Sequence, residues 1–375
     1  MKLALVPLSA VVALVAACGS ASPATTTTTT GGHGTGGAGG AGGAPPTCED
    51  PAAPPTMSCG KLAWTKSLAL SRPRNHHFTA GAPAKAGAFL YAIGGANDNS
   101  VLDNVDRAPI AADGSIGAWT AEAKLPLGAG GLTGGIVSNV VVIAGGMTGG
   151  GVTDKSWSAV VGDDGSLGAW KPAGSVLHRR MHPGSFTKGD TLYVLGGFDD
   201  PTVWDDAVRA TVHADGTLSA WTSAGKLPGP RSHMSVSFVD GYVFLTGGLD
   251  MSALANPPLL ADVSRARLAD DGTLVEWTPM PALPVALATH ASFFYGGYLY
   301  AGGGIDDAPA QEKRVWRAPI GADHALGAWE AAAPLGIARA HVHQLPVFHA
   351  HVYSVAGAID FSLASTTEID VGAFQ

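Results

Sequence analysis

The feature that most constrains this chain is a short phrase that returns about every fifty residues. An Asp-Gly turn followed by tryptophan occurs as "DGSIGAW", "DGSLGAW", "DGTLSAW" and "DGTLVEW", with a weaker fifth copy, "DHALGAW". The phrases end at Trp119, Trp170, Trp221, Trp277 and Trp329. Repeats of this length form stacked or circular arrays, because one unit cannot bury its apolar face alone. We therefore expect a repeat architecture.

A second anchor, a pair of glycines, keeps step with the first. The pairs follow short β-branched and aromatic runs at Gly94-Gly95, Gly145-Gly146, Gly196-Gly197, Gly247-Gly248 and Gly303-Gly304, with Ala356-Gly357 as a weaker sixth copy. Successive pairs lie 51, 51, 51, 56 and 53 residues apart. One period contains a hairpin ("SHMSVSFVDGYVFLTGG"), a third strand ("VSRARLAD") and a fourth strand after the Asp-Gly turn. This pattern predicts a β-propeller blade.

The tight turn and the tryptophan have separate expected roles. We expect Asp-Gly to form a two-residue hairpin, which needs positive φ angles. The tryptophan should pack the outer strand against the neighbouring blade, since an aromatic side chain of this size buries about 150–250 Å².

The two ends of the repeat region are complementary. The final "TTEIDVGAFQ" matches a third strand without its tryptophan strand, and "GKLAW" around Trp64 supplies one. Pairing them closes the ring and removes a free sheet edge. Six blades of about 53 residues need roughly 318 residues, and residues 61–375 number 315. The sequence predicts an all-β, six-bladed propeller of four-stranded antiparallel blades.

The glycine pair, the downstream tryptophan and the Leu-Pro, Arg and His of "KLPGPRSHMSV" resemble the kelch repeat over residues 60–375. "LPLGAGGL" lacks the Arg and His, "ALATH" lacks the Arg, and the last blade lacks one glycine of its pair. The resemblance implies a propeller whose blade-to-blade crossings and post-glycine loops share one face, around the mouth of a channel.

The N-terminal part is expected to lie outside this domain. An apolar run over Leu3–Ala17 ends in "VAAC", which resembles a bacterial lipobox and implies lipidation of Cys18, with an ordinary signal peptide as the alternative. Residues 1–17 are then a signal peptide, 18–58 a flexible tether rich in Thr, Gly, Ala and Pro, and 59–375 the propeller. We expect an exported protein, lipid-anchored to the outer membrane or cell surface.

Two further cysteines, Cys48 and Cys59, bracket the entrance of the propeller. In an exported protein so close a pair favours a disulfide, worth roughly 2–3 kcal/mol, over a metal site, which needs more ligands.

Composition limits the partners. The net charge is −8 with no basic run, so we expect no nucleic-acid partner, and charged residues make up only 14% against 52 glycines. We expect a monomer that binds an unknown protein or glycan, touches a membrane only through its lipid, and needs no cofactor.

Four equivalent crossings carry an Arg-x-His motif. The residues are Arg74, Arg180, Arg231 and Arg339, with His76, His182, His233 and His341. Guanidinium groups near the mouth suit a carboxylate or an acidic glycan. The structural alternative is that repeated Arg and His tie loops together.

The post-glycine loops differ between blades, and variable loops on a rigid scaffold commonly carry specificity. Asp199, Asp200, Asp306 and Asp307 are candidate oxygen ligands for calcium, with solvated acidic turns as the alternative. "HVHQLPVFHAHVY" pairs His341 with His343 and His349 with His351. The pairs flank opposite ends of a hairpin, so one pair with a neighbour is a weak transition-metal candidate against surface or repeat-derived histidines.

Three functions remain open from sequence: a non-catalytic binding scaffold, a carbohydrate-active enzyme and a structural envelope protein. The resemblance brings in two enzyme types, the copper radical oxidases and the sialic acid mutarotases. The oxidase needs a cysteine that residues 61–375 lack, and Tyr91, Tyr193, Tyr300 and Tyr353 occupy equivalent strand positions, which indicates packing. A mutarotase needs only a few positioned acid/base groups. We favour the scaffold, with no catalytic residues assigned.

Overall fold

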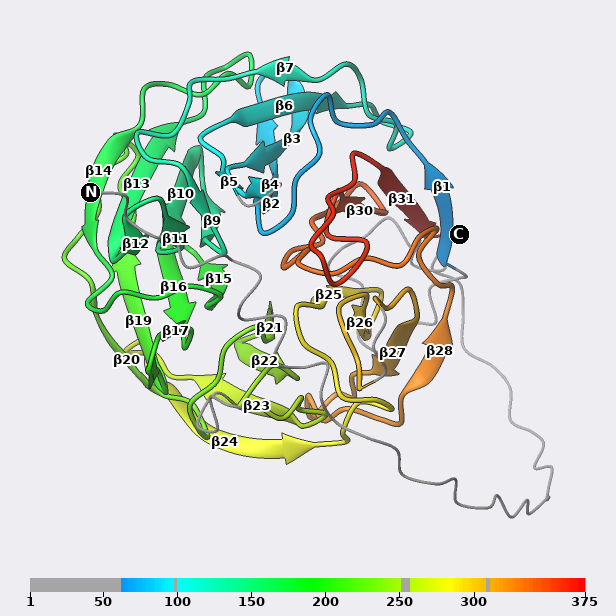
Figure 1. Ribbon diagram of the computed structural model, residues 1–375. Helices are drawn as coiled ribbons and strands as arrows, with labels where there is room; N and C mark the ends of the chain where they lie inside the picture. The colour runs from blue at the N-terminus through cyan, green and yellow to red at the C-terminus, as the bar shows by residue number, and fades with distance from the viewer. Residues whose placement is uncertain (1–61, 98–99, 251–256, 308–310, 375) are drawn as a thin grey trace, which may run out of the picture.

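The computed structural model describes residues 62–97, 100–250, 257–307 and 311–374, and every regular element in these ranges is a β-strand. The larger sheets stand around a ring (Figure 1). Within the described ranges, no helix has the length and apolar character to cross a membrane. The predicted signal peptide, the tether, Cys18, Cys48 and Cys59 lie outside the described residues and stay predictions.

Six sheets have four strands each, and we call them blades A to F in chain order. The first five blades have their strands in the following order, from the innermost outward. Blade A contains β2 (Phe78–Ala84), β3 (Gly87–Ile93), β6 (Val105–Ile110) and β7 (Thr120–Ala121), and blade B contains β9 (Thr133–Val137), β10 (Val140–Ala144), β13 (Lys155–Val160) and β14 (Lys171–Ser175). Blade C contains β15 (Gly184–Lys188), β16 (Thr191–Leu195), β19 (Asp206–Thr211) and β20 (Thr222–Lys226). Blade D contains β21 (Ser235–Val239), β22 (Tyr242–Thr246), β23 (Val263–Leu268) and β24 (Leu274–Met280), and blade E contains β25 (Ala291–Tyr295), β26 (Tyr298–Gly302), β27 (Val315–Pro319) and β28 (Glu330–Ala332).

Blade F joins the two ends of the chain, as the sequence predicts. Its strands are β29 (Val347–Phe348), β30 (His351–Val355), β31 (Ile369–Phe374) and β1 (Leu62–Lys66). β1 runs antiparallel to β31, with Trp64 opposite Gly372. Figure 1 shows β1, in blue, beside β31, in red. Pairing the strands in this way removes the sheet edge that each end would otherwise expose.

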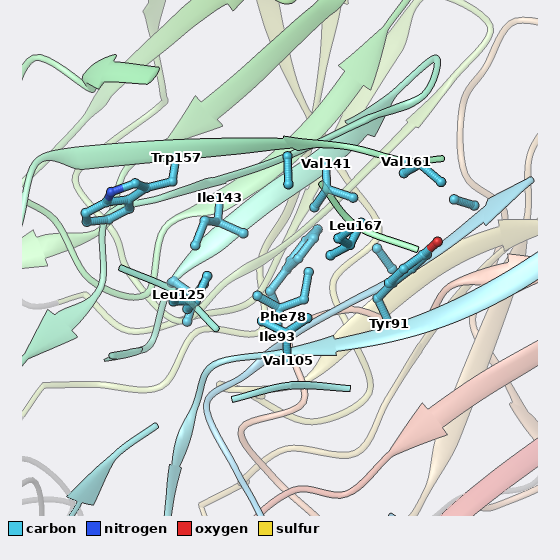
Figure 2. Packing of buried hydrophobic residues seen from close by; sticks show 14 of the residues in the cluster. Phe78, Tyr91, Ile93, Val105, Leu125, Val141, Ile143, Trp157, Val161 and Leu167 are labelled. Carbon is cyan, nitrogen blue, oxygen red and sulfur yellow. The ribbon is translucent and has the colours of Figure 1, made fainter. Parts of the chain in front are cut away.

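The apolar core lies between blades. Six clusters of buried side chains each draw on two adjacent blades. Figure 2 shows the cluster between blades A and B, where Phe78 and Tyr91 face Val141 and Trp157. Because both faces of a blade are covered, its second strand is apolar without alternation, as in "FLYAI" and "VVVIA".

The tryptophans hold neighbouring blades together, which confirms their predicted role. Five of the six repeat tryptophans donate their indole N–H to a carbonyl of the preceding blade or its connection: Trp64 to Ala333, Trp119 to Leu68, Trp170 to Ala123, Trp277 to Lys226 and Trp329 to Pro281. Trp221 is buried, and its N–H has no partner among the described residues.

The prediction of a two-residue hairpin at Asp-Gly was wrong, because the turn is longer. Ile110 pairs with Ile116, and the turn between them closes with the Ala111 N–H donating to the Ser115 carbonyl at 2.9 Å. Gly114 has a φ of 79°, so the glycine alone supplies the left-handed residue. The Asp113 carboxylate instead accepts the Ser115 N–H at 3.0 Å. Aspartate is needed here for a side-chain bond to the backbone two residues on.

We call the side of the ring with the glycine pairs and the blade-to-blade crossings the loop face. There the crossing of each blade pairs with the residue after its own glycine pair, as Asn75 does with Ala96. The second glycine permits this contact: at Gly304, with a φ of 91°, a Cβ would lie 2.4 Å from the Ala288 carbonyl. The loops add the short strands β4 (Ala96–Asn97), β5 (Ser100–Val101), β8 (Ala129–Gly130), β11 (Met147–Thr148), β12 (Gly151–Val152), β17 (Phe198–Asp199) and β18 (Thr202–Val203).

Candidate functional site

The four repeated arginines lie under the loop face with almost no exposure. Arg74, Arg180, Arg231 and Arg339 are 0%, 0%, 6% and 1% exposed. Each guanidinium pairs with an aspartate of its own blade: Asp106, Asp206, Asp262 and Asp370 in the same order. For Arg180, Arg231 and Arg339 the closest N–O distances are 2.9, 2.8 and 2.7 Å.

The Nη1 group of each arginine donates to one or more main-chain carbonyls of the same blade, whereas Nε of Arg74, Arg231 and Arg339 has no partner among the described residues. Arg339 Nη1 donates to Ser354 at 3.2 Å, Ala356 at 2.9 Å and Glu368 at 2.9 Å. These contacts tie the crossing to the second and third strands, and they turn the guanidinium groups away from solvent. These contacts favour the interpretation that the repeated arginines tie loops together. A direct role of the arginines in binding a ligand stays a prediction.

The histidines of the Arg-x-His motif belong to a ring of six residues around the propeller axis. This axial ring has one residue from each blade at the same repeat position: His76, Gly131, His182, His233, Thr289 and His341. The N–H of each donates to the carbonyl of the preceding member, and His76 closes the circle by donating to His341, with distances from 2.8 to 3.1 Å. All six have φ between 52° and 66°, a backbone conformation that residues other than glycine rarely adopt.

Four axial histidines and His343 form the histidine cluster. His76 stacks on His341 with ring centroids 3.8 Å apart, and His182 stacks on His233 at 3.9 Å. His343 bridges them: its Nε2 lies 3.3 Å from His182 Nδ1, and its ring centre is 5.3 to 6.5 Å from the other four. All five residues are buried.

Gly131 allows the two stacked pairs to approach each other. A Cβ at this position would lie 2.9 Å from the His182 imidazole, so the absence of a side chain leaves room for that ring. His182 and His76, two blades apart, consequently have ring centres 5.1 Å apart. The missing His of "LPLGAGGL" is thus part of how the cluster packs.

Burial keeps these imidazoles neutral. Desolvation is the main reason that the pKa values of His76, His182, His233 and His341 lie well below the usual 6.5, and repulsion from neighbouring histidines lowers them further. Burial lowers the pKa of His343 to about 4. A neutral imidazole offers one ring nitrogen as a lone-pair donor, which is the form that binds metals.

A cavity of about 130 Å³ adjoins the cluster. It is lined by the start of the innermost strands of blades C to E, including Ser185, Val236 and Ser292, and by the segment from His343 to Pro346. Pro346 has no N–H to continue the innermost strand of blade F, so β29 has only two residues and the preceding segment is free to carry His343 to the axis.

The other predicted ligands are placed apart from the cluster. His349 and His351 flank the β29–β30 turn, on the face opposite the loop face, with His351 Nδ1 donating to the His349 carbonyl at 2.6 Å. Asp199 pairs with Arg179 at 2.8 Å, and Asp306 pairs with Arg314 at 2.7 Å.

Asp200 and Asp307 are exposed. Among the described residues, the one group placed to hold a metal ion contains none of these aspartates, and calcium binding stays a prediction.

Sequence reasoning missed the convergence of five histidines on the axis. It treated His341 and His343 as one pair and the Arg-x-His motif as a separate feature. The position of the histidines within the repeat could have indicated the cluster. Residues at the same place in each repeat lie at the same distance from the propeller axis, and those at the start of the innermost strand lie nearest to it.

The mouth of the loop face is apolar. The residues after the glycine pairs and in the crossings form a buried cluster that includes Met181, Phe198, Leu249 and Ile305. Partly exposed side chains from four blades pack on it: Met147, Val152, Val203, Leu259 and Phe361. Figure 1 shows the loops that carry them gathered toward the centre of the ring.

No protein-family model matches the chain. Alpha-scruin of Limulus polyphemus is 25% identical over 202 residues, which are 53% of this chain and 21% of scruin. Kelch repeat and BTB domain-containing protein 1 of vaccinia virus (strain Copenhagen) is 26% identical over 42% of this chain and 27% of its own length. Kelch-like protein terF of Aspergillus terreus is 26% identical over 35% and 28%. The matched part spans less than a third of each of these relatives.

A solved structure has the same fold. The structure of YjhT superposes with a TM-score of 0.63 at 12% identity, covering 81% of this chain and 95% of that one.

Proposed function

We propose that this chain, a kelch-repeat β-propeller, is a non-catalytic binding module. It holds a protein partner on its loop face. The observation that carries the proposal is the apolar mouth. Partly exposed Met147, Leu259 and Phe361 come from three different blades, yet they lie on one apolar cluster. An apolar centre with a charged rim is the usual composition of a protein-binding surface.

The rim and the support of this surface fit the same function. Asp200 and Asp307 are exposed in the loops around the mouth. The buried arginine–aspartate pairs and the bridges between crossings and loops hold the loops from beneath. A surface that is already ordered loses little conformational entropy when a partner binds.

The test compares two faces of the propeller. A Met147→Lys/Phe361→Lys variant places charge in the mouth, and Lys188→Glu places an opposite charge at the exposed β15–β16 turn on the far face. Partners cross-linked from envelope extracts are identified, purified and titrated against each protein. We expect at least tenfold weaker binding for the mouth variant, with wild-type binding by Lys188→Glu.

Equal affinity for the mouth variant and the wild type would contradict the proposal. Heat stabilisation by sialic acid or neutral sugars, with no protein captured, would favour the carbohydrate-active alternative, because ligands of the folded state raise its melting temperature.

We further propose that a lipid on Cys18 anchors the module at the outer membrane or cell surface. "VAAC" at the end of an apolar run and the tether that follows support this. Labelling cells with a fatty-acid analogue should mark the wild type and not Cys18→Ser, which should appear in the soluble exported fraction. Equal labelling of both proteins would contradict the anchor.

A further inference from the structure

The histidine cluster contains a buried imidazole nitrogen whose hydrogen-bonding capacity is unused among the described residues. His341 Nδ1 is buried and has no hydrogen-bond partner among the described residues. In the described part of the chain, the side chains of His182 and His343 hydrogen-bond to each other. A polar group buried without a partner is costly, and a bound ligand is one explanation for it.

Neighbouring side chains fix the orientation of His76. The amide of Asn75 donates through Nδ2 to the Leu363 carbonyl at 2.9 Å and to Ser365 Oγ at 2.8 Å. Its Oδ1 therefore faces His76 Nδ1, so this nitrogen must carry the proton and donate. The lone pair of His76 is then on Nε2. A hydrogen bond at one ring nitrogen that frees the other is the usual support of a metal-binding histidine.

We propose that the histidine cluster binds one divalent transition-metal ion, with His76, His182 and His341 as ligands and His343 placed to add a fourth ring nitrogen. One nitrogen from each of the first three residues lies within 4.8 Å of the other two. A tetrahedral ion with metal–nitrogen bonds of about 2.0–2.1 Å separates its ligand atoms by about 3.3–3.4 Å. To satisfy this geometry, the longest nitrogen–nitrogen distance must shorten by about 1.4 Å, and the stacked rings of His76 and His341 must turn so that their lone pairs converge on the ion.

The donor set selects the class of metal. Nitrogen ligands without carboxylates suit zinc, copper, nickel or cobalt, whereas calcium and magnesium require oxygen. The four proposed ligands come from three blades: His76 belongs to A, His182 to C, and His341 with His343 to F. An ion bound here would therefore join blades that do not share a sheet.

The cavity gives the site a route and room for solvent. His343 belongs both to the cluster and to the wall of the 130 Å³ cavity. That volume is large enough for several water molecules, since one needs roughly 10–15 Å³ of the same measure. A rotation of His343 would connect the cavity to His182, and a water or small anion there could complete the coordination.

The test uses the exported full chain after treatment with a chelator. Equilibrium dialysis against zinc or cobalt chloride should give one ion per chain, and bound cobalt should show the absorption of a tetrahedral site. Loss of a direct ligand should exceed the roughly 10–100-fold effect of second-shell changes. We expect binding to weaken by more than about 100-fold in His182→Asn and in His341→Asn. The matched control, His349→Asn/His351→Asn, removes an exposed and a half-buried histidine outside the cluster and should bind as the wild type.

X-ray absorption on zinc-loaded wild type supplies a readout that does not depend on the variants folding, because it counts imidazole ligands directly. Three or four imidazoles are expected. Fewer than three, no binding by the wild type, unchanged binding in both cluster variants, or loss of binding in the His349/His351 control would each overturn the proposal.

Discussion

Replacing Arg339 tests whether the repeated arginines hold each crossing onto its own blade. Its guanidinium is 1% exposed and pairs with Asp370 at 2.7 Å, while a second nitrogen of the group donates to three main-chain carbonyls. Arg339→Met keeps much of the side-chain volume but leaves a carboxylate, itself 1% exposed, without its counter-ion. Breaking a buried pair from one side costs about 3–5 kcal/mol. We expect urea unfolding, followed by tryptophan fluorescence, to show a loss of that size with an unchanged slope.

Blade F provides the control. Lys66 pairs with Glu368 at 2.9 Å, but the two side chains are 65% and 37% exposed, so Lys66→Met should cost only about 0–1 kcal/mol. The Arg339→Met/Asp370→Leu double variant removes both charges and should recover at least about 2 kcal/mol relative to the single variant. If Arg339→Met were no more destabilising than Lys66→Met, the structural role would be refuted and the arginine would be free for a ligand.

Three further predictions test separate parts of the fold. Trp64→Ala removes a half-buried indole and its hydrogen bond to the neighbouring blade, so urea unfolding should show a loss of about 2–4 kcal/mol; an unchanged midpoint would mean that β1 does not close the ring. Gly304→Ala places a Cβ 2.4 Å from the Ala288 carbonyl and should lower the melting temperature far more than Gly189→Ala, whose φ is also positive but whose surroundings are open. Burial lowers the pKa of His290 to about 3, so the folded chain keeps it neutral while the unfolded chain protonates it near pH 6.5. The stability that depends on neutral His290 is complete above that pH and falls by about 1.4 kcal/mol per pH unit below it, in addition to the losses from the other buried histidines. His290→Gln should reduce the slope of stability against pH by that amount, and a pH-independent difference between the two proteins would disprove the prediction.

The architecture could be predicted because its signals are periodic. The glycine pair and the tryptophan occur at the same place in successive blades, so the pattern remains visible even where one blade has lost a residue of the motif. The pairing of the Trp64 strand with the final strand could be predicted because the C-terminal blade lacks a tryptophan strand and the N-terminal segment supplies one. The Asp-Gly turn was misjudged because the dipeptide is shared by two kinds of turn, and only the backbone shows that Asp113 accepts a hydrogen bond while Gly114 alone is left-handed.

The candidate site could not be predicted in the same way. Whether Arg180 faces solvent depends on Asp206, twenty-six residues later, and on a blade geometry that sequence spacing does not specify. The histidine cluster depends on closure of the ring, since His76 and His341 are neighbours only when blades A and F meet. His343 was least predictable, because a proline-shortened strand moves it out of the alternation expected of its repeat.

The pairing of β1 with β31 has a consequence for how the molecule is made. β1, the first strand of the described residues, has no sheet to join until the residues of β31 have emerged, some three hundred positions later. Contacts so distant along the chain form slowly, because a long loop must close before they stabilise anything. Throughout that interval β1 and the growing blades each expose an unpaired backbone edge, and this is when the nascent protein is most open to pairing with another copy of itself.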